Sequence, residues 1–102
     1  DWLSPAILRF LRRVANQANE AGVPVRVCGE MAGRPLEAMA LIGIGIDSFS
    51  ITPAAVGPVK AMVRSIEAQA VRSRLETMLA KPPANFRKSL HDWARRHGAN
   101  IG

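Results

Sequence analysis

Two short stretches of alternating residues constrain the fold of this chain more than any other feature. In the first, three valines alternate with other residues, which predicts a strand over 24–28 whose opposite face carries Arg26 and Cys28. A second alternating stretch predicts a strand over 46–51, and the residues between the two predict a short helix over 35–42. A strand, a helix and a strand joined this closely form a right-handed parallel unit.

The rest of the chain has the periodicity of helices. Apolar residues recur at steps of three and four, and proline or glycine marks most of the ends, which predicts four more helices, over 5–21, 58–66, 68–80 and 84–97. The sequence therefore predicts an α/β fold with two parallel strands and a mostly helical remainder. Two strands leave both outer edges of their sheet with unpaired amides and carbonyls. We therefore expect the unit to be incomplete and to self-associate, by domain swapping or strand pairing.

Length, charge and cysteine content limit the classes of function. The 102 residues allow one domain, and a formal charge of +6 is compatible with a basic nucleic-acid-binding domain, although no nucleic-acid-binding motif accompanies the charge. The single cysteine excludes an internal disulfide and fits a reducing compartment. No apolar run approaches the ~20 residues that span a bilayer, and no signal sequence is present. We expect a cytoplasmic chain without a membrane or nucleic-acid partner, and the missing initiator methionine suggests a piece of a longer protein.

The cysteine lies in a glycine-flanked loop between the first strand and the short helix. The loop reads Cys-Gly-Glu-Met-Ala-Gly over 28–33, and a second motif over 41–53 reads Leu-Ile-Gly-Ile-Gly-Ile-Asp-Ser-Phe-Ser-Ile-Thr-Pro. In order and spacing these motifs resemble the C-terminal end of enzyme I, the family of phosphoenolpyruvate-protein phosphotransferases that start bacterial phosphotransferase relays. The Trp-Ala-Arg-Arg-His-Gly tail over 93–98 looks closer to the nitrogen-related branch than to the sugar branch.

The resemblance implies a fold for the whole chain. The phosphoenolpyruvate-binding domain of the enzyme I family resembles a (β/α)8 barrel of the TIM type, which takes roughly 250 residues. Residues 1–102 look like about its last quarter, a C-terminal portion that contains the last two barrel strands and the helices that follow. Catalytic groups in such barrels lie at the C-terminal ends of the strands. The resemblance therefore implies that the loop after the first strand belongs to an active site.

The resemblance also implies roles for individual residues of this loop. In the family, the cysteine of the Cys-Gly-Glu segment is taken to be the acid and base at carbon 3 of enolpyruvate, a role that falls here on Cys28. A buried apolar cysteine with no chemical role is the alternative. Gly29 and Glu30 become candidate substrate-binding residues. Gly29 could equally be an ordinary turn glycine, and Glu30 a solvated loop carboxylate.

Other polar residues are expected to have plainer roles. We expect Thr52 to cap the helix that follows it rather than to contact a substrate. His91 and His97 are expected at the surface, because the phosphorylated histidine of the family belongs to a separate N-terminal region. Arg34 is expected on the rim of the site, and Arg26, on the same strand face as the cysteine, needs a carboxylate partner from another part of the barrel.

Cofactor and partners follow from the resemblance alone. A protein of this family would use Mg2+ and phosphoenolpyruvate to phosphorylate its own histidine and then an HPr-like phosphocarrier protein, and would form a homodimer. The metal ligands would lie on earlier barrel strands, so we expect no metal ligand in this chain and no activity from the chain alone. Two alternatives stay open. The chain could be a non-catalytic dimerisation module, or it could derive from the related pyruvate phosphate dikinase.

Overall fold

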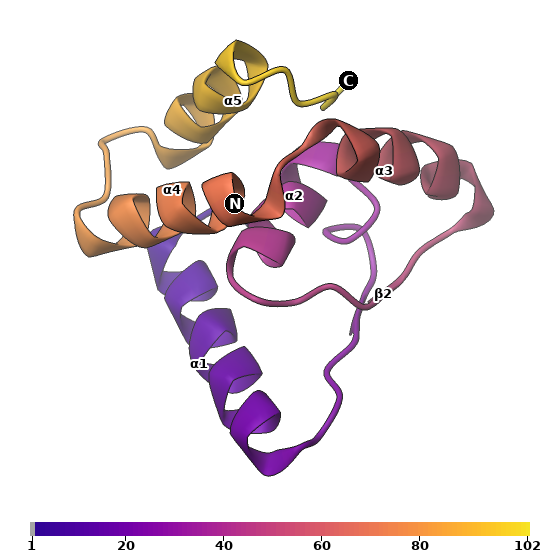
Figure 1. Cartoon of the computed structure of the whole chain (residues 1–102), viewed down its shortest axis with the longest axis vertical. Helices are drawn as coiled ribbons and strands as arrows, with labels where there is room; N and C mark the ends of the chain where they lie inside the picture. Colours follow the sequence, from indigo (N-terminus) through magenta and orange to yellow (C-terminus); the bar gives the residue numbers. More distant parts are fainter. Residues whose placement is uncertain (1) are drawn as a thin grey trace.

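The computed structural model describes residues 2–102, and its secondary structure is mostly helical (Figure 1). Within these residues five helices and two strands follow one another along the chain. Their order and bounds are α1 (Pro5–Ala21), β1 (Val27–Cys28), α2 (Pro35–Gly43), β2 (Phe49–Ser50), α3 (Pro53–Ser65), α4 (Ala68–Ala80) and α5 (Phe86–Arg96).

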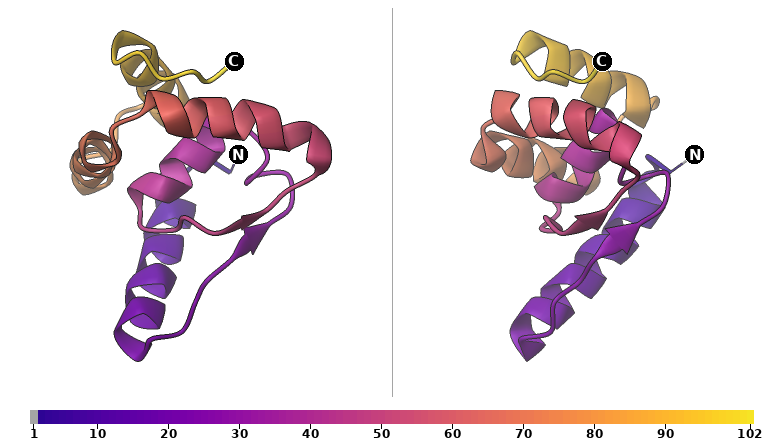
Figure 2. Two further views of the ribbon diagram at one scale, coloured as in Figure 1. Left: turned by 45° about the vertical axis from the view of Figure 1, so that its right-hand side comes forward. Right: turned by 90° about the vertical axis from the view of Figure 1, so that its right-hand side faces the viewer.

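Helix α2 lies in the middle of the molecule, surrounded by other helices (Figure 2). Almost every residue of α2 is buried, because its sequence is apolar on all sides. Gly43, at its end, shows how close the packing is: a Cβ there would lie 2.9 Å from Cγ of Leu75 on α4. The largest fully buried side chains come from α2 itself and from the helices around it, among them Met39 of α2 and Leu8, Met62, Leu75 and Leu90. The core of the molecule is therefore built around α2.

The helix ends follow the residues that local chemistry favours. Helix α1 starts after Ser4, whose hydroxyl accepts a hydrogen bond from the Ile7 amide at 3.2 Å, and closes at Gly22 in the left-handed conformation with φ 70°. Helix α4 starts after Glu67, whose carboxylate accepts from the amides of Gln69 and Ala70 at 3.1 and 2.7 Å. These ends fix both helices at the bounds that apolar periodicity predicts.

The two strands are shorter than predicted. They form a parallel pair in which Val27 faces Phe49 and Cys28 faces Ser50, so only two residues of each strand pair. The alternation in the predicted strand over 24–28 is still visible in which side chains are buried: Val25 and Val27 are half-buried, whereas Arg26 is exposed. The predicted strand over 46–51 is likewise shortened to its paired residues. The correction has a physical reason, since alternation reports which face is covered but a ladder needs a partner chain along its whole length.

Three predicted helices have different bounds in the structure. Helix α2 ends at Gly43 rather than at 42. Helix α3 begins at Pro53 rather than at 58, so Pro58 lies inside the helix instead of starting it. Proline suits the first position of a helix, and the chain uses Pro53 there, with Thr52 as the preceding residue. Helix α5 covers Phe86–Arg96 rather than 84–97 because Asn85 caps it, accepting from the Lys88 amide at 3.1 Å.

Polar contacts hold α1 and the C-terminal tail against the other helices. Arg9 of α1 donates to the carbonyl oxygen of Leu79 near the end of α4, with Nε at 3.2 Å. Ser65 Oγ, at the end of α3, accepts from the Asn100 amide at 2.7 Å and so holds the C-terminal tail. None of the helices in residues 2–102 combines the length and the apolar character that a bilayer crossing requires.

Candidate functional site

The parallel pair of strands brings two sequence motifs side by side. Cys28 ends β1, Ser50 ends β2, and the two residues are direct partners in the ladder. In a parallel pair both chains leave the strands at the same edge. The loop after Cys28 and the turn at Thr52 therefore meet at one end of the strands, beside the N-terminal ends of α2 and α3.

A groove of about 370 Å³ lies at this end of the strands. Its lining combines the loop after β1 with the start of α3: Gly29, Glu30, Gly33, Arg34, Ser50, Thr52 and Ala55. Cys28 is exposed and immediately precedes the groove residue Gly29, but it is not part of the lining. Gly29 adopts φ 102°, a backbone conformation that a side chain rarely tolerates, so a glycine is required where the loop leaves the strand.

The loop itself is anchored at its centre. Met31 and Ala32 are buried in the core, while Glu30 beside them is exposed. Two backbone hydrogen bonds close the loop, from the Gly33 amide to the Glu30 carbonyl at 3.1 Å and from the Arg34 amide to the Met31 carbonyl at 3.4 Å. Packing therefore holds the middle of the loop, and polar contacts hold its edge.

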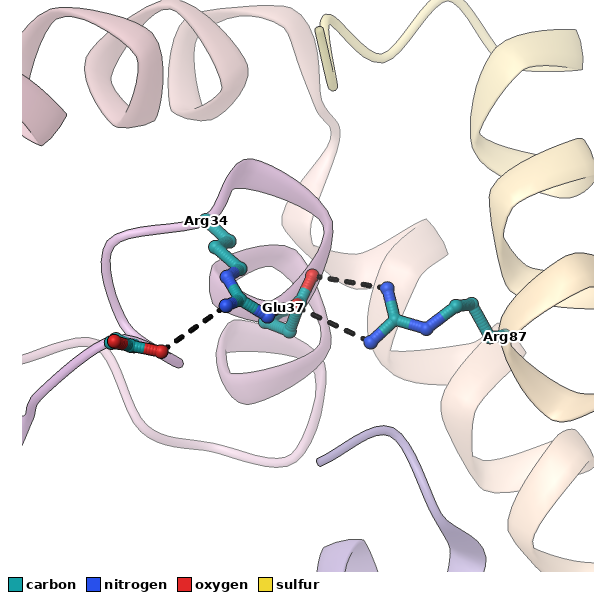
Figure 3. A network of polar contacts seen from close by, with 4 residues as sticks. Arg34, Glu37 and Arg87 are labelled. Atoms are coloured by element: carbon teal, nitrogen blue, oxygen red, sulfur yellow. Dashed lines mark hydrogen bonds and ion pairs between the residues drawn. The ribbon is translucent and has the colours of Figure 1, made fainter. Parts of the chain in front are cut away.

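A chain of four charged residues runs from this loop to α5 (Figure 3). Glu37, in the first turn of α2, is the buried member, with its side chain 3% exposed. Its Oε2 lies 3.3 Å from an Arg34 nitrogen and 3.3 Å from an Arg87 nitrogen, and its Oε1 lies 3.5 Å from the other terminal nitrogen of Arg87. Arg34 continues the chain to the Glu30 carboxylate at 3.2 Å.

The predicted site residues are distributed unevenly around this groove. Gly29 and Glu30 line it, and the carboxylate of Glu30 is paired with Arg34. Arg34 lies on the rim, as expected, but it also links two carboxylates. Thr52 occupies the position before α3 without a capping hydrogen bond from its side chain, which corrects the expectation that it caps this helix.

His91 lies on α5 and His97 caps its C-terminal end, and the surroundings of the two histidines differ. His97 is exposed, its Nδ1 lies 2.8 Å from the carbonyl oxygen of Trp93, and its ring stacks on that of Trp93 with a centroid separation of 4.3 Å. His91 is half-buried, with its Nδ1 3.9 Å from the Asp92 carboxylate. Neither histidine lines the groove beside Cys28.

Glu37 is the residue of this region that sequence reasoning missed. Its position, directly before a run of alanine, methionine and leucine, placed it on a helix that is apolar on all sides. A carboxylate in such a place needs a cationic partner. That requirement was a usable signal, although it could not point to Arg87, which lies 50 residues further along the chain.

Comparison with known proteins assigns the chain to a family. The family model described as the phosphoenolpyruvate (PEP)-binding domain of PEP-utilising enzymes matches residues 1–68, which contain both strands, the Cys28 loop and α1 to α3. The chain belongs to the PEP-utilising enzymes. The matched residues end at the first residue of α4, so the rest of α4 and α5 lie outside the match.

Several curated proteins resemble this PEP-utilising chain. It is 50% identical over 60 residues to a phosphoenolpyruvate-protein phosphotransferase of Cupriavidus necator, a match that covers 59% of the chain and 10% of that protein. It is 42% identical over 67 residues to a phosphoenolpyruvate-dependent phosphotransferase system protein of Salmonella typhimurium, covering 66% of the chain and 9% of that protein. A phosphotransferase of Bacillus sp. is 34% identical over 77 residues, covering 76% and 13%. The chain thus spans about a tenth of the length of these relatives.

Proposed function

We propose that this chain forms the C-terminal part of the PEP-binding barrel of a phosphoenolpyruvate-protein phosphotransferase. The observation that carries the proposal is the place of the Cys-Gly-Glu-Met-Ala-Gly motif, which follows the end of a parallel strand and borders a groove. This is the edge at which barrel enzymes of this type hold their catalytic groups. The family match to residues 1–68 and the phosphotransferase names of the relatives support the same assignment.

In this proposal Cys28 transfers the proton at carbon 3 of the substrate. Once the phosphoryl group has left PEP, the thiol gives its proton to carbon 3 of the enolate. The electron pair of the C2–C3 double bond forms the new C–H bond, the carbonyl at C2 is restored, and a thiolate remains. A thiol suits both directions, because it can give a proton to a carbanion and the thiolate that remains can take one back. The exposure of Cys28 leaves its sulfur open to a substrate on that side of the strands.

The rest of the barrel would cover the open side of the strand pair. Arg26 and Cys28 are exposed, whereas Val25 and Val27 on the opposite face are half-buried against the helices. The exposed face would become the interior of the barrel, and the other strands would pair with the free edges of β1 and β2. The nitrogen-related branch, the cytoplasmic location and dimer contacts through this domain belong to the same proposal.

The remaining machinery is assigned to parts of the protein outside this chain. Within residues 2–102, no three His, Cys, Asp or Glu side chains gather in a way that could hold a metal ion. This segment by itself therefore does not fit Mg2+, which takes several oxygen ligands. We propose that the Mg2+ ligands, the phosphorylated histidine and the surface for an HPr-like phosphocarrier lie in other regions. The chain alone is accordingly expected to be inactive.

The decisive experiment follows the exchange of the C3 protons of pyruvate into deuterated water by NMR, in the longer protein that contains this segment. The variants are Cys28→Ala and Cys28→Ser, the latter nearly matched in size, with Ser73→Ala on the exposed side of α4 as control. Loss of a general acid and base costs about 10²- to 10⁴-fold in rate. Both cysteine variants are expected to lose exchange while the control keeps it. Wild-type exchange in Cys28→Ala with the fold retained would refute the proposed role.

A further inference from the structure

The buried carboxylate of Glu37 joins two parts of the chain that the sequence separates. Arg34 reaches it from the end of the Cys28 loop, and Arg87 reaches it from the first turn of α5 (Figure 3). The two arginines share Oε2 at 3.3 Å each, and Arg87 adds a second contact to Oε1 at 3.5 Å. One carboxylate thus sets the positions of both guanidinium groups.

Burial makes this arrangement dependent on both arginines. The Glu37 side chain is 3% exposed, whereas those of Arg34 and Arg87 are 52% and 38% exposed. A buried charge is destabilising unless partners satisfy its oxygens, and a two-point arginine contact fixes geometry as well as charge. Without Arg87, Oε1 would lose the contact at 3.5 Å, and the Glu37 carboxylate would be drawn towards Arg34.

The second contact of Arg34 links the Glu37–Arg87 ion pair to the Cys28 loop. Arg34 also binds the Glu30 carboxylate at 3.2 Å, and Glu30 and Arg34 stand at the two ends of the turns that close the loop. A shift of the Arg34 guanidinium towards Glu37 would therefore release Glu30 and loosen the amides of Gly33 and Arg34. These amides lie within six residues of Cys28 along the chain.

We infer that Arg87 of α5 is a positioning residue for the Cys28 loop, acting through Glu37 and Arg34. Its catalytic consequence rests on the proposed role of Cys28, whereas its effect on the loop does not. Helix α5 lies beyond residues 1–68, the part that matches the PEP-binding domain. A segment outside the residues that the family model matches thus helps to hold the loop that carries the proposed acid and base.

The test is amide hydrogen exchange of the chain, followed residue by residue by NMR. In Arg87→Met, the Gly33 and Arg34 amides are expected to exchange roughly tenfold faster, the size expected for a lost charged hydrogen bond. The matched control is Arg95→Met, which removes one positive charge from an exposed part of the same helix. An arginine that only docks α5 would speed exchange in α5 and leave the loop unchanged, which would overturn the inference.

A double-mutant cycle keeps the test independent of overall stability. If the effect of Arg87 passes through Arg34, Arg87→Met should add nothing to loop exchange in an Arg34→Met background. Additive effects of the two substitutions on the exchange rates of the loop amides would show that Arg87 does not act through Arg34. Glu37→Gln, which keeps the shape of the side chain without its charge, should reproduce the faster loop exchange, and wild-type protection in that variant would also overturn it.

The longer protein provides the catalytic readout. There Arg87→Met is expected to lower kcat for C3 proton exchange several-fold, because the loop that carries the thiol moves. A changed KM with an unchanged kcat would overturn the inference. The proposed function fails separately, if Cys28→Ala keeps exchange, so the two failures are distinguishable.

Discussion

Cys28 and Ser50 are direct partners in the two-residue parallel ladder, and both lie on its exposed face. This pairing places the first residue of the Cys-Gly-Glu motif beside the C-terminal part of the second motif, although helix α2 lies between the two paired residues in the sequence. The groove at this edge takes residues from both motifs, including Glu30 and Thr52. A substrate bound there would be in contact with both.

The first prediction concerns the accessibility of Cys28. Because Cys28 is the only cysteine and is exposed, a disulfide reagent such as DTNB is expected to titrate one thiol per folded chain without denaturant. The comparison variant carries Ala32→Cys together with Cys28→Ser, which moves the thiol to a fully buried position of the same loop. That thiol should react only on unfolding. A Cys28 that needs denaturant to react would contradict the exposed position.

The second prediction concerns the contact between α2 and α4. In Gly43→Ala the new Cβ would meet Leu75 Cγ at 2.9 Å and Val71 Cγ1 at 3.0 Å, both from branched core side chains. Overpacking of this kind lowers the free energy of unfolding by about 1–3 kcal/mol. Urea unfolding followed by circular dichroism measures the loss.

Gly57→Ala is the control for that substitution. Gly57 lies inside α3 and a Cβ there would meet nothing within 4 Å. The usual helical gain of about 0.5–1 kcal/mol from Gly→Ala is offset by Pro58, since a residue with a Cβ before proline disfavours the helical region. We therefore expect a stability close to that of the wild type. Equal losses in both variants would argue against close packing at Gly43.

The third prediction concerns the pH dependence of α5. A hydrogen bond from the Lys88 ammonium, 3.0 Å away, together with the charges of Lys88, His91 and Arg96, holds the pKa of Asp92 below its usual value of 3.8. A lowered carboxyl pKa stabilises the folded state above the unfolded value, and this contribution is lost as the pH falls through the folded pKa. NMR titration of the Asp92 carboxyl carbon should therefore give a midpoint below 3.8.

Replacing the partner of Asp92 tests the cause of this shift. In Lys88→Met the pKa of Asp92 is expected to move back towards 3.8, because its largest cause has been removed. Lys81→Met, which removes a charge from the end of α4, should leave the titration unchanged. If the Asp92 midpoint is the same in Lys88→Met as in the wild type, the pair is not formed in solution.

Features of the fold that depend on neighbouring residues could be predicted from the sequence, whereas those that depend on distant segments could not. The bounds of α1 and α4 follow from residues beside them, such as Ser4, Gly22 and Glu67, and these helices are predictable for that reason. The strands were predicted too long, because pairing of Val27 with Phe49 depends on where two distant segments run together. Pro58 misled the prediction of α3, because proline favours the first position of a helix, whereas here it lies inside the helix that Pro53 starts.

The features of the candidate site also fall into local ones, which the sequence predicts, and long-range ones, which it does not. The motif around Cys28 could be recognised from consecutive residues, and so could the glycine requirement at Gly29, which its φ of 102° explains. The contact between Glu37 and Arg87 could not, because nothing in the spacing of 50 residues selects one arginine among many. The catalytic roles assigned to Cys28, Gly29 and Glu30 remain predictions for the experiments above.

The close contact of Gly43 with Leu75 and Val71 has a consequence for how such domains can be trimmed and exchanged. The family model matches residues 1–68, but side chains that shield the central helix α2, such as Leu75, come from the segment after residue 68. A hybrid protein joined at residue 68 to another tail would keep the packing at Gly43 and the ion pair of Glu37 only if that tail supplied side chains equivalent to Leu75, Val71 and Arg87. Exchange between relatives should therefore succeed when α2, α4 and α5 are transferred together.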